Sequence, residues 1–285
     1  MEQIPDWPLL WRQLVEAQAR GLKEKQGNKP EDAWADRART FGDHVKKRWE
    51  KEDSTRRFMV DLLQAHPGST VLDIGAGTGS WACLLAPYAA KVTALEPSAA
   101  MIAVMEENIS RFGITNVEIV RDSWPDAAVT EHDFSLCSHA MYGEADFPSF
   151  VRRLDEVTKR CCLLLMRAPV ADGVMSKIAR EVLGQPYDSP NFQIAYNILL
   201  GMGIFANVLM EDTGLWKPWT HDSLEEAVDA VKRRLGLVED GRHDPFLKRI
   251  LQENLAWENG KLSWPAGVCS ALIYWHKPSS SENRG

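Results

Sequence analysis

The sequence predicts an α/β fold: a doubly wound, mostly parallel sheet of seven strands, with extra N-terminal and C-terminal helices that cap the active site. Two observations carry this prediction. Short apolar runs alternate with helical patterns between residues 70 and 166, which is typical of parallel βαβ units. A glycine-rich loop follows the first of these runs, and helical spacing fills most of the chain on either side of this region.

The composition is that of an ordinary globular protein. Of 285 residues, 45% are hydrophobic and 26% are charged, so the chain can bury a core without disulfides or metals. The net charge of −7 disfavours a basic nucleic-acid-binding surface, and we expect no nucleic-acid partner. No apolar run approaches about 18 residues, and the N-terminus lacks the apolar core of a secretory signal, so we expect no membrane partner.

Cysteine and histidine usage points the same way. Five cysteines without regular spacing indicate reduced thiols and a cytoplasmic location. Seven histidines show no paired spacing, so no metal site is expected. The adjacent Cys161 and Cys162 should point to opposite faces of a strand, which makes both of them core residues rather than ligands of one ion.

The chain is expected to divide into three parts. Residues 1–66 carry helical patterns and form an N-terminal helical cap. Residues 67–278 form the sheet domain, with helical insertions at about 170–202 and 220–260. Residues 279–285 follow Pro278 and form a disordered tail.

Seven strands are expected, the last two separated by a long helical stretch. Their ranges are 70–74, 91–96, 117–120, 133–137, 161–166, 203–210 and 268–275. The expected helices are about 7–20, 34–49, 54–66, 80–89, 98–112, 172–184, 190–201, 222–236 and 244–256.

The glycine-rich loop is the clearest sign of a binding site. Asp73 ends the first strand region, and Gly75-Ala76-Gly77-Thr78-Gly79 follows. Glycines permit tight turns and a close approach of the backbone to a ligand, and the helix beyond offers free N–H groups. The dinucleotide fingerprint would need its third glycine at Ser80, and the spacing here is one residue shorter.

An acid followed by this spacing of glycines resembles motif I of the class I S-adenosylmethionine-dependent methyltransferases. The resemblance covers about residues 68–168 and implies a Rossmann-like fold, S-adenosylmethionine as cofactor and S-adenosylhomocysteine as product. Glu96 ends the second strand, where a carboxylate accepts hydrogen bonds from a ribose diol. It also matches the second motif of the family, as does the following Pro97.

The same resemblance supplies an adenine pocket. Met101 lies where family members often place a side chain on the adenine face, although packing in the core is the alternative. Asp122 matches the acid that accepts a bond from the adenine amino group, and Ser123 and Trp124 would complete the pocket. A helix-capping turn is the other interpretation of this segment.

The acceptor is expected beyond the fourth strand. In many family members the segment corresponding to Ser138-His139-Ala140-Met141-Tyr142 faces the methyl group. Ser138 and His139 are therefore assigned to the cofactor site as well. His139 is a candidate general base and Tyr142 a candidate hydrogen-bonding residue; the alternative is that both only line the pocket.

Several residues outside these motifs stay open. Arg167 could bind an anionic acceptor or be a surface charge. Asn191, Gln193, Tyr196 and Asn197 form a polar face that could contact substrate, but packing is the simpler interpretation. Trp216 and Trp219 stand in a loop and could wall or cover a pocket. Of the 11 tryptophans, eight are assigned to the helical cap and its loops.

The sequence therefore predicts an enzyme that transfers a methyl group from S-adenosylmethionine to a small or medium-sized acceptor by in-line displacement. A roof of helices from both ends of the chain suits an enclosed acceptor. The alternatives are an NAD-dependent oxidoreductase and a catalytically silent cofactor-binding protein. The nucleophile of the acceptor and the oligomeric state, monomer or homodimer, are left open.

Overall fold

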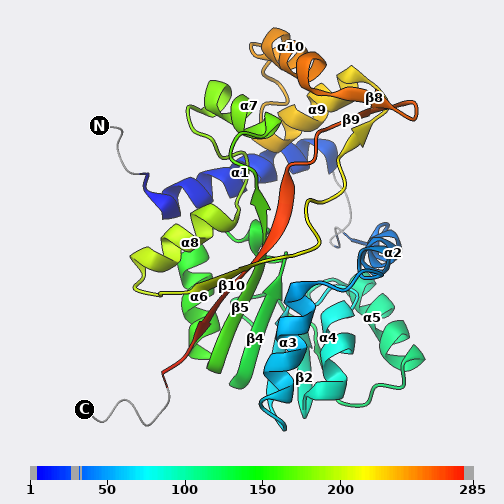
Figure 1. Ribbon diagram of the computed structural model, residues 1–285, viewed down its shortest axis with the longest axis vertical. Coiled ribbons are helices and arrows are strands. Elements are labelled where there is room, and N and C mark those ends of the chain that lie inside the picture. Colours follow the sequence, from blue (N-terminus) through cyan, green and yellow to red (C-terminus); the bar gives the residue numbers. More distant parts are fainter. Residues whose placement is uncertain (1–4, 27–31, 33, 279–285) are drawn as a thin grey trace.

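The computed structural model describes residues 5–26, 32 and 34–278 (Figure 1). The predicted disordered tail at 279–285 lies outside the described residues. A seven-stranded sheet forms the centre of the molecule, with strand order β3-β2-β1-β4-β5-β10-β6. The strands are β1 (Thr70–Ile74), β2 (Lys91–Leu95), β3 (Val117–Val120), β4 (His132–Ser138), β5 (Thr158–Pro169), β6 (Asn207–Met210) and β10 (Val268–His276).

The sheet is doubly wound and mostly parallel, as predicted. Strands β1 to β5 pair in parallel, whereas β10 runs antiparallel to both β5 and β6. The order reverses next to β1, so the carboxyl ends of β1 and β4 open a crevice between them. The helices around the sheet are α1 (Trp7–Gln26), α2 (Ala38–Arg48), α3 (Ser54–Gln64), α4 (Ser80–Leu85), α5 (Ala99–Arg111), α6 (Phe147–Glu156) and α8 (Phe192–Gly201), with 3-10 turns η1 (Ala86–Tyr88) and η2 (Met141–Gly143).

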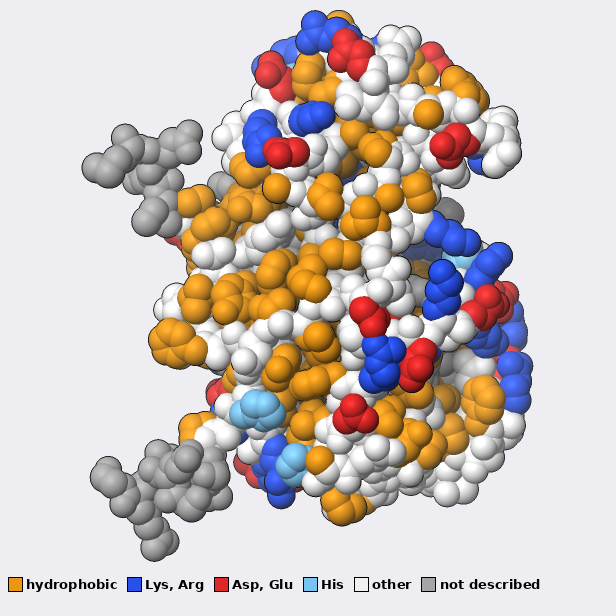
Figure 2. Space-filling view, in the orientation of Figure 1, with side chains coloured by type: hydrophobic (Ala, Val, Ile, Leu, Met, Phe, Trp, Pro, Cys, Tyr) orange, Lys and Arg blue, Asp and Glu red, His pale blue; other side chains and the backbone are white. Residues whose placement is uncertain are grey.

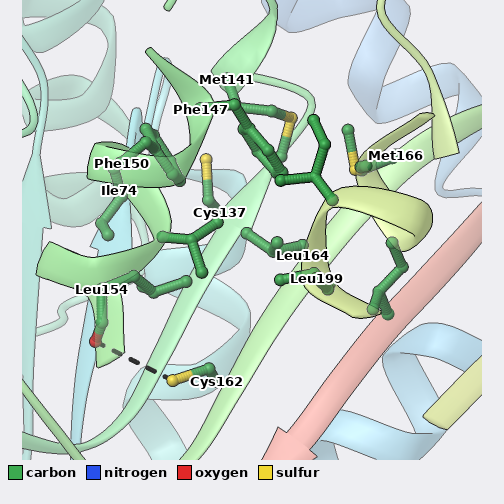
Figure 3. Packing of buried hydrophobic residues seen from close by; sticks show 14 of the residues in the cluster. Ile74, Cys137, Met141, Phe147, Phe150, Leu154, Cys162, Leu164, Met166 and Leu199 are labelled. Carbon is green, nitrogen blue, oxygen red and sulfur yellow. Dashed lines mark hydrogen bonds between the residues drawn. The ribbon is translucent and has the colours of Figure 1, made fainter. Parts of the chain in front are cut away.

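Successive residues of the strands point to opposite faces of the sheet and pack into two separate hydrophobic cores. On one face, side chains of the sheet pack with α1, α6 and α8, and on the other with α3, α4 and α5. Figure 3 shows the first of these cores, in which the Cys162 thiol donates to the Leu154 carbonyl oxygen. Cys161 belongs to the opposite core, which confirms that the two neighbouring cysteines face opposite sides of β5.

Helix α1 is part of the central core. The Trp11 side chain has no exposed surface, stacks on Phe147 with ring centroids 4.2 Å apart, and donates from Nε1 to the Glu144 carbonyl oxygen at 2.7 Å. Trp11 lies within residues 1–66, which were predicted to form an N-terminal cap, but it is a residue of the central core. Its indole fills the space between α1 and α6, because a large apolar side chain gains most where both helices can cover it.

A smaller lobe stands above the sheet, at the top of Figure 1. It has its own hydrophobic cluster, built on helices α7, α9 and α10. A three-stranded antiparallel sheet of order β7-β9-β8 completes it. Its elements are α7 (Val174–Leu183), β7 (Thr220–His221), α9 (Leu224–Leu235), α10 (Asp244–Asn254), β8 (Ala256–Glu258) and β9 (Lys261–Ser263).

Most predicted elements are present, but several of their bounds differ and some observed elements were not predicted. The sixth strand begins at Asn207 rather than at residue 203, because Gly203 has a left-handed backbone that breaks the extended run. The small sheet of the lobe and helix α6 had no counterpart in the sequence-based prediction. Asp146 caps α6 by accepting from the Ser149 N–H, and Phe147 and Phe150 lie on its buried face.

The outer edge of the large sheet carries exposed apolar side chains. In the view of Figure 2, hydrophobic side chains gather across the middle of the molecule, over α8 and β6. Strand β6 pairs with β10 on one side only, so its side chains are less covered than those of the inner strands. Exposed apolar residues here are Leu200, Phe205, Val208 and Met210. No helix in the described part of the chain is long and apolar enough to cross a membrane.

Candidate functional site

A cavity of about 810 Å³ opens at the carboxyl ends of β1, β2 and β4. The glycine-rich loop forms one wall, and its three glycines all have positive φ. At Gly75 a Cβ atom would lie 2.3 Å from the Cβ of Ala140, and at Gly79 it would lie 2.4 Å from Met105 Cγ. Those two glycines therefore permit close packing inside the protein. Gly77 is different, since a Cβ there would meet only Phe41, at 3.7 Å, and it can present its backbone to a ligand.

Glu96 stands at the end of β2 and faces the same cavity. Its carboxylate accepts the Gly77 N–H at 2.8 Å on Oε2 and the Ser98 N–H at 2.9 Å on Oε1. Burial raises the pKa of Glu96, and the two backbone N–H donors oppose that shift. Each oxygen keeps a second lone pair, so the carboxylate can still accept from the two hydroxyls of a ribose.

An apolar slot lies beside Glu96. Met101 is almost fully buried in its wall. The Trp124 ring lies edge-on to the Phe150 ring with centroids 6.0 Å apart, and both side chains line the cavity. Asp122 and Ser123 line the same cavity. A flat base between Met101 and the aromatic rings would have a polar edge within reach, which fits the predicted adenine pocket.

Helix α2 covers the cavity. Its apolar stripe, with the turn before it and the residue after it, contributes Trp34, Phe41, Val45 and Trp49 to the wall. Asp32 fixes this segment, because its carboxylate accepts from the Ser98 hydroxyl and, at 3.0 Å, from the Ala100 N–H. These bonds lower the pKa of Asp32, the Ala100 donor having the largest effect. The helical spacing indicated the stripe, but nothing in the sequence links Asp32 to the start of α5.

His139 and Tyr142 meet at the far end of the cavity. His139 follows β4 with φ +56°, and its Nδ1 lies 3.0 Å from the Tyr142 hydroxyl. That hydroxyl also accepts the Arg167 backbone N–H at 2.7 Å. Because a hydroxyl both donates and accepts, either tautomer of His139 is compatible with this bond, and the pair can take up or give a proton.

Arg167 and Trp216 close this end. The Arg167 guanidinium lies over the Tyr142 ring at 4.0 Å, and the Trp216 ring lies edge-on to His139 at 5.3 Å. Arg167 is not the surface charge that was one of its two interpretations. Burial lowers the pKa of Arg167 to about 10, with a further contribution from Arg234.

The structure brings most of the predicted site residues into one wall. Asp73 and Gly79 are the two that do not line the cavity. Asp73 lies behind it, fully buried, and burial together with the charge of Glu96 raises its pKa to about 7. The residues that do line the cavity are Gly75, Ala76, Gly77, Thr78, Glu96, Pro97, Met101, Asp122, Ser123, Trp124, Ser138, His139 and Tyr142.

The polar face of α8 does not reach the cavity. Asn191 caps the helix by accepting from the Gln193 N–H at 2.9 Å, and Tyr196 donates to the Ala206 carbonyl oxygen at 3.0 Å. Asn197 donates back to the Gln193 carbonyl oxygen. These side chains hold α8 and the loop after it, which agrees with the packing interpretation.

Comparisons with known proteins agree with this geometry. Residues 71–160 match the family model described as "Methyltransferase domain". An uncharacterized protein of Haemophilus influenzae is 24% identical over 233 residues, which is 79% of this chain and 83% of that protein. A protein-L-isoaspartate O-methyltransferase of Methanoregula boonei is 42% identical over 62 residues, but the match covers only 22% of this chain and 29% of that enzyme.

A solved structure extends the likeness of the fold. The YcgJ protein of Bacillus subtilis superposes with a TM-score of 0.53 at 16% identity, over 79% of this chain and 98% of that one. Three observations therefore point to the same domain: the similarity in fold, the matched family model, and the glycine-rich loop with Glu96 in the cavity wall. The chain therefore carries a methyltransferase domain over residues 71–160, in a fold of the Rossmann-like, S-adenosylmethionine-dependent type.

Proposed function

We propose that this protein transfers a methyl group to a small or medium-sized acceptor held next to His139 and Tyr142. One observation carries the proposal: the glycine-rich loop, Glu96 and the His139–Tyr142 pair all line the same cavity. A donor bound along the loop and an acceptor at the pair would then share a single enclosed space, covered by α2 and by Trp216.

The residues of the wall fit the methyl donor. The open side of Gly77 and the buried carboxylate of Glu96 suit a ribose and the chain attached to it, and the apolar slot suits a flat base. When bound, S-adenosylmethionine supplies a methyl group on a positively charged sulfur, which is already activated for displacement. We assign cofactor binding to the lining residues named above, and leave Asp73 and Gly79 a supporting role behind them.

The protein's own contribution is alignment, exclusion of water and handling of a proton. Aromatic side chains from α2 and from the loop after β6 keep water from the reacting atoms. Holding the nucleophile in line with the methyl carbon supplies much of the acceleration. If the nucleophile carries a proton in the bound state, His139 takes it, and the Tyr142 hydroxyl orients the imidazole through Nδ1.

The acceptor class remains part of the proposal. The family implies a methyl acceptor, and the covered cavity supports a small molecule rather than a nucleic acid. A cytoplasmic location, suggested by the cysteine usage, is likewise a prediction. The matched domain does not favour the NAD-dependent alternative. The turnover test described next distinguishes an active enzyme from a catalytically silent binding protein.

The test is release of S-adenosylhomocysteine from S-adenosylmethionine in the presence of pooled small-molecule acceptors, of cellular RNA and of unfolded protein, each in a separate assay. We expect product only with a small-molecule pool. Tyr142→Phe should lower turnover with little change in cofactor affinity. Turnover with RNA or protein alone would contradict the acceptor class, and no turnover with any pool would favour the silent binding protein.

A further inference from the structure

A second cavity adjoins the cofactor cavity and has no role in the proposal so far. Its volume is about 270 Å³, and it lies between the end of β5 and the small lobe, with the start of α7 in its wall. Arg167 and Trp216 line both cavities, so these two side chains form the partition between them. We call this second cavity the side chamber.

The walls of the side chamber carry an excess of positive charge. Four basic side chains and two acidic ones line it. Both acids are already paired, Asp188 with Arg234 and Asp172 with Arg180. The basic lining residues are Arg167, Lys177, Lys217 and Arg234.

Arg167 has an incomplete set of hydrogen bonds. Its Nε donates to the Pro190 carbonyl oxygen at 2.8 Å, whereas its buried Nη2 has no acceptor among the described residues. Burying a donor without an acceptor is unfavourable, and more so when the donor is charged. The buried Trp264 Nε1, in the same chamber, also lacks an acceptor within the described part of the chain.

The backbone adds a third set of donors. Helix α7 begins at Val174, and its N-cap residue Gly173 offers no side-chain bond to the first turn. Val174, Met175 and Ser176 line the chamber, so the positive end of the helix dipole lies at its wall. The apolar part of the wall includes three tryptophans: Trp216, Trp219 and Trp264.

We propose that the side chamber holds a carboxylate of the methyl acceptor, with Arg167 as its anchor and the tryptophans packed against an aromatic or apolar body. This assignment rests on the proposed function, since it names the class of acceptor for the same site. A carboxylate supplies the acceptor atoms that Arg167 Nη2, Trp264 Nε1 and the first turn of α7 lack. The nucleophile would then pass between Arg167 and Trp216 toward His139 and Tyr142.

The experiment uses two matched probes, indole-3-acetate and its uncharged analogue indole-3-acetamide. Each is titrated by calorimetry into the full-length protein saturated with S-adenosylhomocysteine. We expect the carboxylate to bind at least about tenfold more tightly than the amide, as expected for a charge-assisted hydrogen bond of ~1.5–3 kcal/mol. Equal affinities, or no binding of the carboxylate, would overturn the assignment.

Variants then locate the binding. Arg167→Met should abolish the preference for the carboxylate, and Trp264→Phe, which keeps an aromatic ring but removes the N–H, should weaken it severalfold. Arg160→Met is the control, because Arg160 lies on the same strand but is exposed and paired with Asp133; it should keep the preference. A preference that survives in Arg167→Met overturns the assignment.

The affinity of each protein for S-adenosylhomocysteine separates the two proposals. Loss of the carboxylate preference with intact S-adenosylhomocysteine binding contradicts only the side chamber. A wild-type protein that does not bind S-adenosylhomocysteine contradicts the proposed function itself.

Discussion

At the scale of single residues, two carboxylates hold the loops around the site by accepting hydrogen bonds from backbone N–H groups. Glu96 connects the glycine loop to the start of α5 by accepting from Gly77 and Ser98. Asp32 makes a similar connection from the covering segment to Ser98 and Ala100. Glu96, which would touch the cofactor, therefore also holds the glycine loop in place, and Asp32 holds the covering segment from outside the cavity.

Glu96→Gln should weaken S-adenosylmethionine binding. The amide keeps one acceptor oxygen but replaces the other with a donor, so either Gly77 or Ser98 loses its bond and the ribose loses a partner. The expected loss is ~1–3 kcal/mol, or roughly five- to 150-fold in affinity. Titration calorimetry checks it, with Glu118→Gln as the control because Glu118 is exposed on β3 and paired with Lys91. An affinity unchanged in Glu96→Gln would contradict the ribose role.

The buried carboxyl group of Asp73 should make the stability of the protein depend on pH. Burial and the charge of Glu96 raise its pKa from 3.8 to about 7, so the folded protein holds a proton that the unfolded chain has already lost. The stability that this group contributes is present below about pH 4 and is lost as pH rises toward 7. Asp73→Asn removes this dependence. As pH rises from 4 to 7, the free energy of unfolding of the variant should therefore increase relative to that of the wild type, by at most ~1.4 kcal/mol per pH unit.

Unfolding by denaturant at pH 4.5, 6 and 8, without cofactor, measures this difference. Other carboxylates titrate in both proteins, so only the difference between the two curves is informative. A difference that stays constant from pH 4.5 to pH 8 would contradict the raised pKa of Asp73.

At the scale of elements, the covering parts are fixed by close helix contacts. Helices α1 and α9 cross where α1 carries a glycine: a Cβ at Gly21 would lie 1.9 Å from the Arg233 carbonyl oxygen. At Gly236, just after α9, a Cβ would lie 2.9 Å from the Ala17 carbonyl oxygen. The small lobe is therefore attached to α1, which itself belongs to the core of the sheet.

Gly21→Ala should destabilise the protein, although alanine favours a helix over glycine by ~1 kcal/mol. The added methyl group can be accommodated only if α1 and α9 move apart, which we expect to cost ~1–3 kcal/mol net. Gly201→Ala, in the last turn of α8, is the matched control, because a Cβ there would have open space. Thermal unfolding of the two variants checks this; equal midpoints would argue against the tight crossing.

At the scale of the whole molecule, the sequence was sufficient to predict the sheet and the cavity wall formed by the glycine loop, Glu96 and Met101. The segments that cover the cavity could be predicted only in part. Strand, glycine loop and helix are consecutive in the chain, so local patterns were enough to place Gly77, Glu96 and Met101. The Asp32–Ser98 contact joins segments 66 residues apart, and no local pattern encodes it. Strands of two or three residues in the lobe are too short to show alternation.

Helix α6 and Trp11 show that a helical pattern in the sequence does not by itself determine where a segment packs. The spacing of Phe147, Phe150, Val151 and Leu154 is that of an amphipathic helix, so the sequence does carry a signal for α6. Trp11 has the same helical spacing whether it caps the sheet or fills its core, so only the packing against Phe147 decides between them.

The central claim is that the main cavity binds S-adenosylmethionine. Titration calorimetry of the wild-type protein with S-adenosylmethionine, S-adenosylhomocysteine and NAD tests it most directly. We predict one site per chain for S-adenosylmethionine, displaced by S-adenosylhomocysteine, and no saturable binding of NAD. Saturable binding of NAD together with no binding of S-adenosylmethionine would contradict the account.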